Sequence, residues 1–337
     1  MPIPLLSLYR RFEQLGNVAT QGSRGGTGLW TTYLPESFFE ELQGRPAPAV
    51  RRAAAVAAAA STEARRAEAK ATAMPTAGGS LEGRVWESSR DPAGCREVQA
   101  ALESAGTDEE REALAAELEG HVFEASRCPH ANHVLQKCVL TIRRESFQFI
   151  VDEVAAKLFA IAKSRFGCRV IQRLIERCES DEVGEIVSRL IAEFKDLSRH
   201  EYGNYVLQHI LEHGTPEQQR TLRSSIEEAA YDLCAHPQSC ALLCATLSGG
   251  SAEDQLVLAM RIMATESVEL GHLAAMACKR RGHVVLKRAL AVLGEPESRP
   301  LVEMLEGTKS ALAVSKYGMS MLKFIEELNS GVVDVQA

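Results

Sequence analysis

The sequence lacks the features on which several classes of protein depend. No apolar stretch approaches the ~20 residues that a membrane-spanning helix needs, so no membrane association is expected. The nine cysteines are scattered and include no Cys-x-x-Cys pair, which favours unpaired structural thiols in a reducing compartment. No nucleophile–base arrangement and no phosphate-binding glycine loop is present. We therefore predict no catalytic residue, no enzymatic activity and no cofactor.

Positive charge is also scarce. The formal net charge is −7, and residues 94–337 hold 27 Lys and Arg against 36 Asp and Glu, a difference of −9 (27 − 36). Proteins that bind nucleic acid usually neutralise phosphates with basic side chains. Such a function in this chain would have to rely on local clusters of basic residues.

Composition divides the chain into three regions. We expect residues 1–80 to be low-complexity and mostly disordered, residues 81–330 to form a repeat domain, and residues 331–337 to be a tail. Within the first region the alanine-rich segment 53–71 predicts an isolated helix, and the segment 75–80 predicts a flexible break. A regulatory tail is the favoured role of residues 1–80, with a targeting segment as the alternative.

What the sequence does contain is a pentapeptide that recurs at a nearly constant spacing. It has a small polar residue first, a flat residue second, two mostly apolar residues next, and Gln at the end. The four copies begin 37, 36 and 36 residues apart, at Cys95, Asn132, Cys168 and Asn204. Repetition at this period indicates stacked supersecondary units.

Each unit is predicted to be helical. The apolar residues Val170, Leu174 and Cys178 are four apart, as expected for one face of a helix. Thr107 and Thr215 each begin a segment that fits a capping box, in which a Thr side chain and an acidic or amide side chain cap a helix start. We expect two or three short helices per unit and no strand.

The spacing within the pentapeptide places three side chains together. The first, second and fifth positions share one helix face, whereas the third and fourth point into the core. An exposed polar helix face without a function would carry assorted residues here. The recurrence of Gln at the fifth position, and of Arg, His, Arg and Tyr at the second, argues against that interpretation.

These pentapeptides resemble the RNA-binding repeats of the Pumilio family. The resemblance implies an all-α, curved, right-handed superhelical solenoid of ~36-residue repeats. Later frames at Cys240, His283 and Met319 extend it to about six repeats and a C-terminal cap, equivalent to the family's third to eighth repeats. The family's first two repeats are not recognisable before Gly83.

The resemblance also implies a role for each position. In the family the first and fifth positions hydrogen-bond a base edge, and the second stacks between bases. The implied base-edge residues are Cys95, Gln99, Asn132, Gln136, Cys168, Gln172, Asn204 and Gln208. The implied stacking residues are Arg96, His133, Arg169 and Tyr205. Cys/Gln pairs would read adenine and Asn/Gln pairs uracil, so the antiparallel RNA read by these units is 5′-UAUA-3′.

The later frames depart from the family pattern. The degenerate positions are Cys240, Ala241, Cys244, His283, Val284 and Lys287. None of them supplies an acidic acceptor for guanine, so we do not expect recognition of the 5′-UGU that the family usually reads. Lys287 could contact a phosphate instead of a base.

Basic residues stand five positions before each intact pentapeptide, at Arg90, Arg127, Lys163 and Arg199. They are candidate phosphate contacts, and solvated repeat-boundary residues are the alternative. The pairs Cys240/Cys244 and His209/His213 each have the i, i+4 spacing of half a metal site. Neither has a partner pair at ligand spacing in the sequence, so no metal is predicted.

The leading functional hypothesis is sequence-selective binding of AU-rich single-stranded messenger RNA, with the 3′ untranslated region as the expected target. It implies post-transcriptional and translational regulation by a cytoplasmic monomer with protein co-regulators; a nuclear, nucleolar or organellar location is the alternative. A second hypothesis is a Pumilio-like scaffold with degenerate base readout, acting through protein contacts or structured RNA, as in ribosome biogenesis. A HEAT or armadillo adaptor has no use for the regular Gln.

Overall fold

The computed structural model describes residues 81–178, 180–263 and 271–330. The predictions made for residues 1–80 and 331–337 lie outside this range. Within it, all regular secondary structure is helical, and no helix is both long enough and apolar enough to cross a membrane. The helical repeat fold predicted from the sequence is confirmed.

Each of the six repeats contains three main helices, which we call the first, middle and outer helix. The first helices are α4 (Val85–Ser89), α7 (Val122–Arg127), α10 (Leu158–Ala162), α13 (Phe194–Arg199), α16 (Ala230–Cys234) and α19 (Gly271–Ala277). The middle helices are α5 (Gly94–Ser104), α8 (Ala131–Thr141), α11 (Gly167–Arg177), α14 (Gly203–His213), α17 (Ser239–Ser248) and α20 (Gly282–Leu293). The outer helices are α6 (Asp108–Ala116), α9 (Gln148–Ala156), α12 (Ser180–Ala192), α15 (Pro216–Glu228), α18 (Ala252–Met263) and α21 (Arg299–Gly307). The 3₁₀ helix η1 (Arg144–Phe147) precedes α9, and α22 (Lys309–Leu312) with α23 (Lys316–Asn329) closes the C-terminal end.

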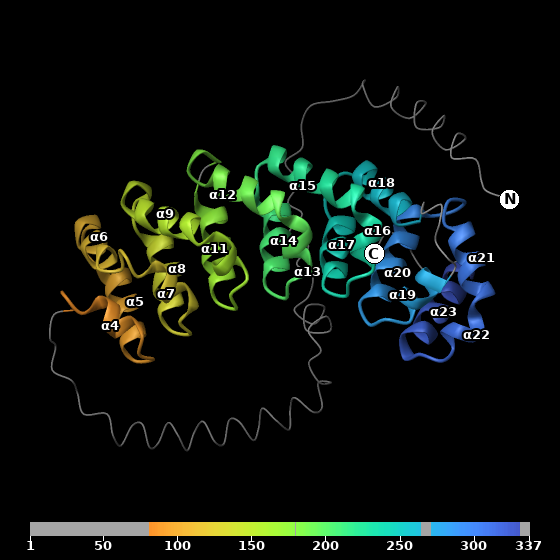
Figure 1. Cartoon of the computed structure of the whole chain (residues 1–337), viewed down its shortest axis with the longest axis horizontal. Helices are drawn as coiled ribbons and strands as arrows, with labels where there is room; N and C mark the ends of the chain where they lie inside the picture. Colours follow the sequence, from red (N-terminus) through yellow and green to blue (C-terminus); the bar gives the residue numbers. More distant parts are fainter. Residues whose placement is uncertain (1–80, 179, 264–270, 331–337) are drawn as a thin grey trace, which may run out of the picture. The chain divides into compact units, whose positions relative to one another are not determined.

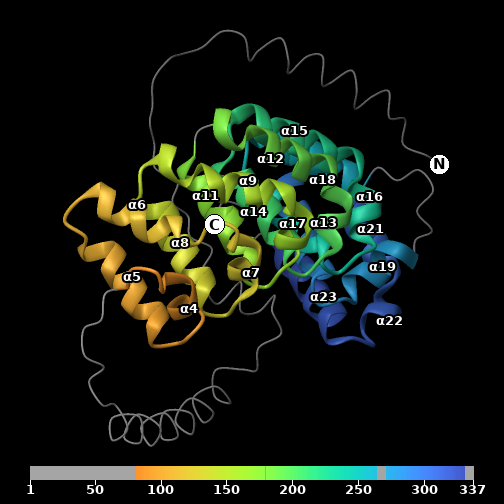
Figure 2. The ribbon, with the colours of Figure 1, turned by 60° about the vertical axis from the view of Figure 1, so that its left-hand side comes forward.

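The repeats stack in chain order, as Figures 1 and 2 show from two directions. Each middle helix contacts the next, from α5 through α20, and α20 contacts α23. The outer helices form a second layer, in which α9, α12, α15 and α18 contact one another in turn. The middle helices therefore present one continuous surface built from the same register of every repeat.

The core lies between these layers and continues from repeat to repeat. On α11 the residues Val170, Ile171, Leu174 and Ile175 are all buried, as the helical spacing predicted. A single repeat could not cover this apolar face alone, so stability depends on the neighbours.

Close backbone contact fixes the start of the middle helices. Five helix starts carry a glycine in the same register: Gly94, Gly167, Gly203, Gly282 and Gly318. A Cβ atom on Gly167 would lie 2.6 Å from the carbonyl oxygen of Ile161, six residues earlier in the first helix. At Gly167 a side chain would therefore overlap the backbone of the first helix.

In each of the first two repeats, a glutamate carboxylate from the outer helix region caps the start of the first helix of the same repeat. Glu153 accepts hydrogen bonds from the backbone N–H groups of Gly120 and Val122, at 2.6 and 3.1 Å. Glu117 does the same for Gly83 and Val85, at 2.7 and 2.8 Å. These N–H groups begin the first helix and have no partner within it, so the carboxylate acts as a remote N-terminal cap.

Candidate functional site

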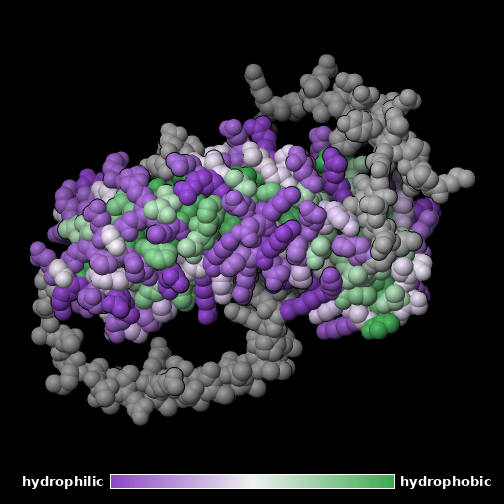
Figure 3. Space-filling view, in the orientation of Figure 1, coloured by the Kyte–Doolittle hydropathy of each residue, from purple (hydrophilic) through white to green (hydrophobic). Residues whose placement is uncertain are grey.

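The four intact pentapeptides occupy equivalent places in the fold. Each begins at the second residue of a middle helix, in α5, α8, α11 and α14. The third and fourth residues are buried in three of these helices; the exception is α5, where Glu97 is exposed and Val98 is buried. Because these helices contact one another in order, the structure brings the predicted base-edge and stacking residues together along one surface. In the view of Figure 3, hydrophilic and hydrophobic residues are interspersed over the repeats.

The two Asn/Gln pairs are joined by hydrogen bonds. The Nε2 group of Gln136 donates to Oδ1 of Asn132 at 2.9 Å, and that of Gln208 donates to Oδ1 of Asn204 at 2.7 Å. Asn132 is fully buried, and its own Nδ2 group donates to the carbonyl oxygen of Cys128 at 2.8 Å. The Asn side chain thus orients the Gln amide. Gln136 is partly exposed, whereas Gln208 is buried and its Nε2 group also donates to the carbonyl oxygen of Asn204 at 3.4 Å.

The two Cys/Gln pairs are arranged differently. Gln99 Nε2 donates to the Cys95 sulfur and to the Cys95 carbonyl oxygen, both at 3.1 Å. Gln172 Nε2 instead reaches the next repeat and donates to the carbonyl oxygen of Tyr205 at 3.2 Å. Burial raises the pKa of the Cys95 and Cys168 thiols, so both are protonated at neutral pH. Neutral buried thiols are poor nucleophiles, which suits a packing or recognition role.

The flat residues at the second position are accessible to a ligand. Arg96, His133 and Arg169 are exposed, and Tyr205 is partly exposed. The planar guanidinium group and the imidazole and phenol rings all present a face on which a base can stack. A ligand can therefore reach all four side chains from solvent.

The basic residues before the pentapeptides share one register, at the end of each first helix. Arg90 pairs with Glu87 at 3.4 Å and lies over the Trp86 ring. Arg127 lies over the Phe123 ring, with 5.3 Å between the guanidinium carbon and the ring centre.

Lys163 and Arg199 continue this series. Lys163 forms an ion pair with Asp196 of the next repeat, and Arg199 is exposed. The same register holds Ala235, Cys278 and Val314 in the later units. The basic series therefore ends where the intact pentapeptides end.

In the fifth repeat the side chains of the degenerate frame are buried in the protein core. Cys240, Ala241 and Cys244 are buried, and burial raises the pKa of the two thiols to about 11 and about 12. This frame presents no polar pair comparable to Asn204 and Gln208.

In the sixth repeat the corresponding side chains contact the cap. His283 stacks on Tyr317 with 5.1 Å between ring centres. Lys287 donates to Ser320 Oγ at 2.9 Å and lies over the Phe324 ring. Val284 is partly exposed. The side chain that was considered for a phosphate is thus already engaged within the protein.

One group that the sequence analysis did not assemble lies beside this surface. Glu176 on α11 faces His209 and His213 on α14, and one ligand atom from each of the three lies within 4.8 Å of the others. Glu176 follows Gln172 by four residues, and His209 follows Tyr205 by four. The repeat register aligns Glu176 and His209 one helical turn beyond Gln172 and Tyr205, but it does not show that their side chains meet.

The fold and the repeated side-chain set define the class of protein: a helical-repeat solenoid in which four successive repeats carry an equivalent side-chain triplet. The family model described as the Pumilio-family RNA binding repeat matches residues 89–119, 121–155, 157–191 and 194–226. Four repeats of this chain match the Pumilio-family repeat, as the pentapeptides predicted. These matches fall on the four repeats with intact pentapeptides.

Known proteins agree with this assignment. Pumilio homology domain family member 4 of Saccharomyces cerevisiae is 36% identical over 61 residues, which is 18% of this chain and 7% of that protein. The match therefore spans a small part of the length of this relative.

Among solved structures, PUF-8 in complex with PBE-RNA has a TM-score of 0.66 at 20% identity, covering 74% of this chain and 72% of that chain. The Puf4 RNA binding domain bound to an HO endonuclease RNA 3′ UTR recognition sequence has a TM-score of 0.66 at 22% identity, covering 72% and 77%. Likeness at these identities establishes the fold.

Proposed function

We propose that this protein binds single-stranded RNA through the surface of its middle helices. One observation carries the proposal. Four consecutive middle helices each contain a Gln with a Cys or Asn four residues before it, and a flat side chain at the second position of the pentapeptide. A recognition mode that reads one base per helical repeat with two or three side chains needs this arrangement. The solved relatives described as RNA complexes support it.

The proposed core sequence is 5′-UAUA-3′, read from the fourth repeat back to the first. In the Asn units the Gln amide is held by Asn132 or Asn204 and offers its Oε1 acceptor to uracil. In the Cys units the small buried thiol leaves room for adenine beside Gln99 or Gln172. Each stacked base contributes about 1–3 kcal/mol to binding.

The contact with bases is proposed to end after the fourth repeat. Beyond it the frame at Cys240 is buried, and Lys287 is engaged by Ser320 and Phe324. Four reading units make the binding weaker and more permissive than eight would, because several stacked bases are missing.

The test compares fluorescence anisotropy of the full-length protein with labelled oligonucleotides that differ only in a UAUA or UCUC core. We expect UAUA to bind more tightly, and Gln136→Ala to weaken that binding about tenfold, equivalent to about 1.4 kcal/mol. Gln148→Ala is the matched control, because Gln148 is exposed on the outer helix α9 and bonds only locally, to Asp152. Equal affinity for the two oligonucleotides, or loss of binding in the control alone, would refute base reading.

Specific observations favour a second candidate, a scaffold with degenerate readout that binds protein or structured RNA. The net charge of −9 over residues 94–337 opposes RNA, and two of the six repeats offer no base reader. Weak, salt-sensitive and equal binding of both oligonucleotides in the same assay would support it.

The wider role that we propose follows from the first candidate. A protein that occupies AU-rich messenger RNA, in its 3′ untranslated region, can control translation or decay by recruiting co-regulators. We propose that it does so as a cytoplasmic monomer. Crosslinking of the endogenous protein to RNA in cells, followed by sequencing, tests this, since recovery of only ribosomal RNA would contradict it.

A further inference from the structure

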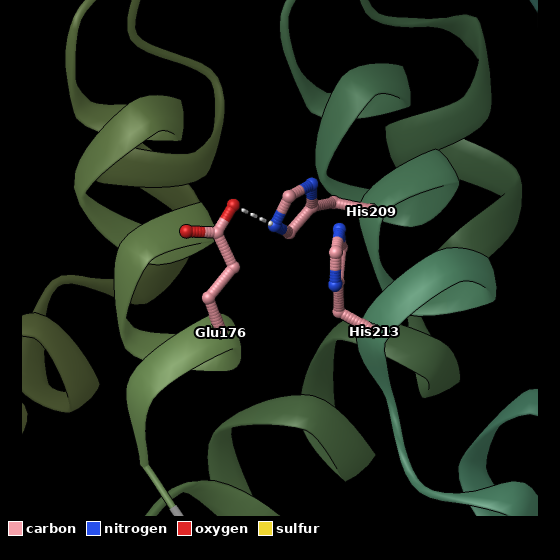
Figure 4. Close-up of side chains that lie close together, drawn as sticks. All are labelled: Glu176, His209 and His213. Atoms are coloured by element: carbon pink, nitrogen blue, oxygen red, sulfur yellow. Dashed lines mark ion pairs between the residues drawn. The ribbon is translucent and has the colours of Figure 1, made fainter. Parts of the chain in front are cut away.

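The junction between the third and fourth repeats contains two rows of contacts, one helical turn apart. In the first row, Gln172 Nε2 donates to the carbonyl oxygen of Tyr205. In the second, Oε1 of Glu176 lies 2.9 Å from Nε2 of His209. His213 follows one turn further along α14, and its ring centre is 4.3 Å from that of His209 (Figure 4).

The three side chains converge on a shared space, as Figure 4 shows. The His209 side chain retains 13% of its exposure and that of Glu176 retains 23%. The Nε2 atom of His209 is buried and, although it is close to the carboxylate, has no hydrogen-bond partner of acceptable geometry among the described residues. A carboxylate oxygen and two imidazoles thus meet where one buried nitrogen is unsatisfied.

The chemistry of these donors is that of a transition-metal site. Two imidazoles and one carboxylate form a known set of zinc ligands, with one coordination position left open. Arg173 pairs with the other oxygen of Glu176, which holds the carboxylate in place.

The geometry requires only a small adjustment. Zinc bonds of about 2.0–2.2 Å in a tetrahedron separate the ligand atoms by about 3.4 Å. Here the ligand atoms lie within 4.8 Å of one another. The side chain of His213 is 45% exposed and can move inward without disturbing the core.

We propose that Glu176, His209 and His213 form a binding site for one divalent transition-metal ion, with Zn²⁺ as the expected metal. The ion joins α11 to α14 and therefore fixes the spacing between the third and fourth repeats. It lies one helical turn beyond Gln172 and Tyr205, at the edge of the surface proposed to bind RNA. Any influence on RNA affinity rests on that proposed function, whereas metal binding does not.

The test is a titration of the purified, metal-free, full-length protein with Zn²⁺ in competition with a chromophoric chelator, without RNA. We expect one equivalent to bind, and the affinity to fall at least tenfold in His213→Gln and in Glu176→Gln. His236→Gln is the matched control, because His236 is a partly exposed histidine between α16 and α17, far along the chain from the site. Circular dichroism establishes that each variant is folded.

A Co²⁺ titration separates this site from the thiols, since all nine cysteines are free. The expected spectrum is that of a nitrogen- and oxygen-ligated ion, without the charge-transfer band of thiolate ligands. That result, together with a higher thermal midpoint for the wild type in Zn²⁺ and no such shift in His213→Gln, supports the site. Absence of stoichiometric binding, a thiolate band, or unchanged affinity in His213→Gln overturns it. Because RNA is not in the assay, failure here leaves the RNA proposal untouched.

Discussion

At the scale of the residue, the first position of each pentapeptide determines what the Gln amide is free to do. Asn132 accepts a hydrogen bond from Gln136 and fixes its orientation. Cys95 is smaller and buried, and its sulfur accepts only a weak hydrogen bond from Gln99. The choice between Asn and Cys therefore changes the donor and acceptor pattern of the Gln without changing the Gln itself.

We predict that Asn132→Cys converts the second unit from uracil to adenine. The variant should prefer a UAAA core over UAUA by about tenfold, which corresponds to about 1.4 kcal/mol of discrimination. The physical reason is that Cys removes the acceptor that orients Gln136 and frees volume for a purine. Competition binding with the two oligonucleotides measures the preference.

The reciprocal variant, Cys95→Asn, serves as the control and should move the preference from UAUA to UAUU. If Asn132→Cys weakens both oligonucleotides equally, then the residue acts in folding and not in reading. The buried hydrogen bond from Asn132 to Cys128 makes that outcome measurable as a lower unfolding free energy.

At the scale of the element, the glycine register holds the first and middle helices together. We predict that Gly167→Ala destabilises the protein by about 1–3 kcal/mol, because the new methyl group overpacks against Ile161. Gly184→Ala is the control: nothing lies within 4 Å of a Cβ there, and alanine favours a helix by up to about 1 kcal/mol. Urea unfolding followed by circular dichroism compares them, and equal loss in both would contradict the packing argument.

Much of the element scale was predictable from the sequence. The capping box at Thr215 forms fully, with Gln218 donating to and accepting from the cap. At Thr107 the helix start is also correct, but the Glu110 carboxylate accepts from Gly106 instead of Thr107. The periodic spacing of apolar and capping residues is local, so it can be read from the chain.

The arrangement between repeats was not predictable in the same way. Glu176 is 33 residues from His209, and no local spacing marks them as neighbours. Nor does the sequence say that Lys287 will bond Ser320 instead of facing a ligand. Such contacts depend on how adjacent helices turn toward one another, which becomes known only when the repeats are stacked.

At the scale of the whole molecule, a protein of net negative charge is proposed to bind RNA, and the basic residues before the four pentapeptides are the candidate phosphate contacts. We predict that Arg199→Ala weakens binding of UAUA and UCUC oligonucleotides to the same degree, because a phosphate contact carries no sequence information. The slope of the logarithm of affinity against the logarithm of salt concentration should fall by about 0.7 in magnitude. Anisotropy titrations at several salt concentrations measure both effects.

Arg220→Ala is the control for charge alone, since Arg220 lies on the outer helix α15 and bonds to Pro216 within that helix. An equal change of slope in Arg220→Ala would mean that net charge, and not the basic series, determines affinity. A selective loss for UAUA in Arg199→Ala would mean that Arg199 contributes to base reading.

The degenerate frames after the fourth repeat limit how much RNA sequence the protein can recognise. A reader of four bases selects a word that random RNA contains about once in every 256 nucleotides, so competing sites are abundant. Within a cell, such a word cannot by itself single out a few transcripts. Target choice by this protein would then depend on a second source of information, such as clustered copies of the word or a partner that reads neighbouring sequence.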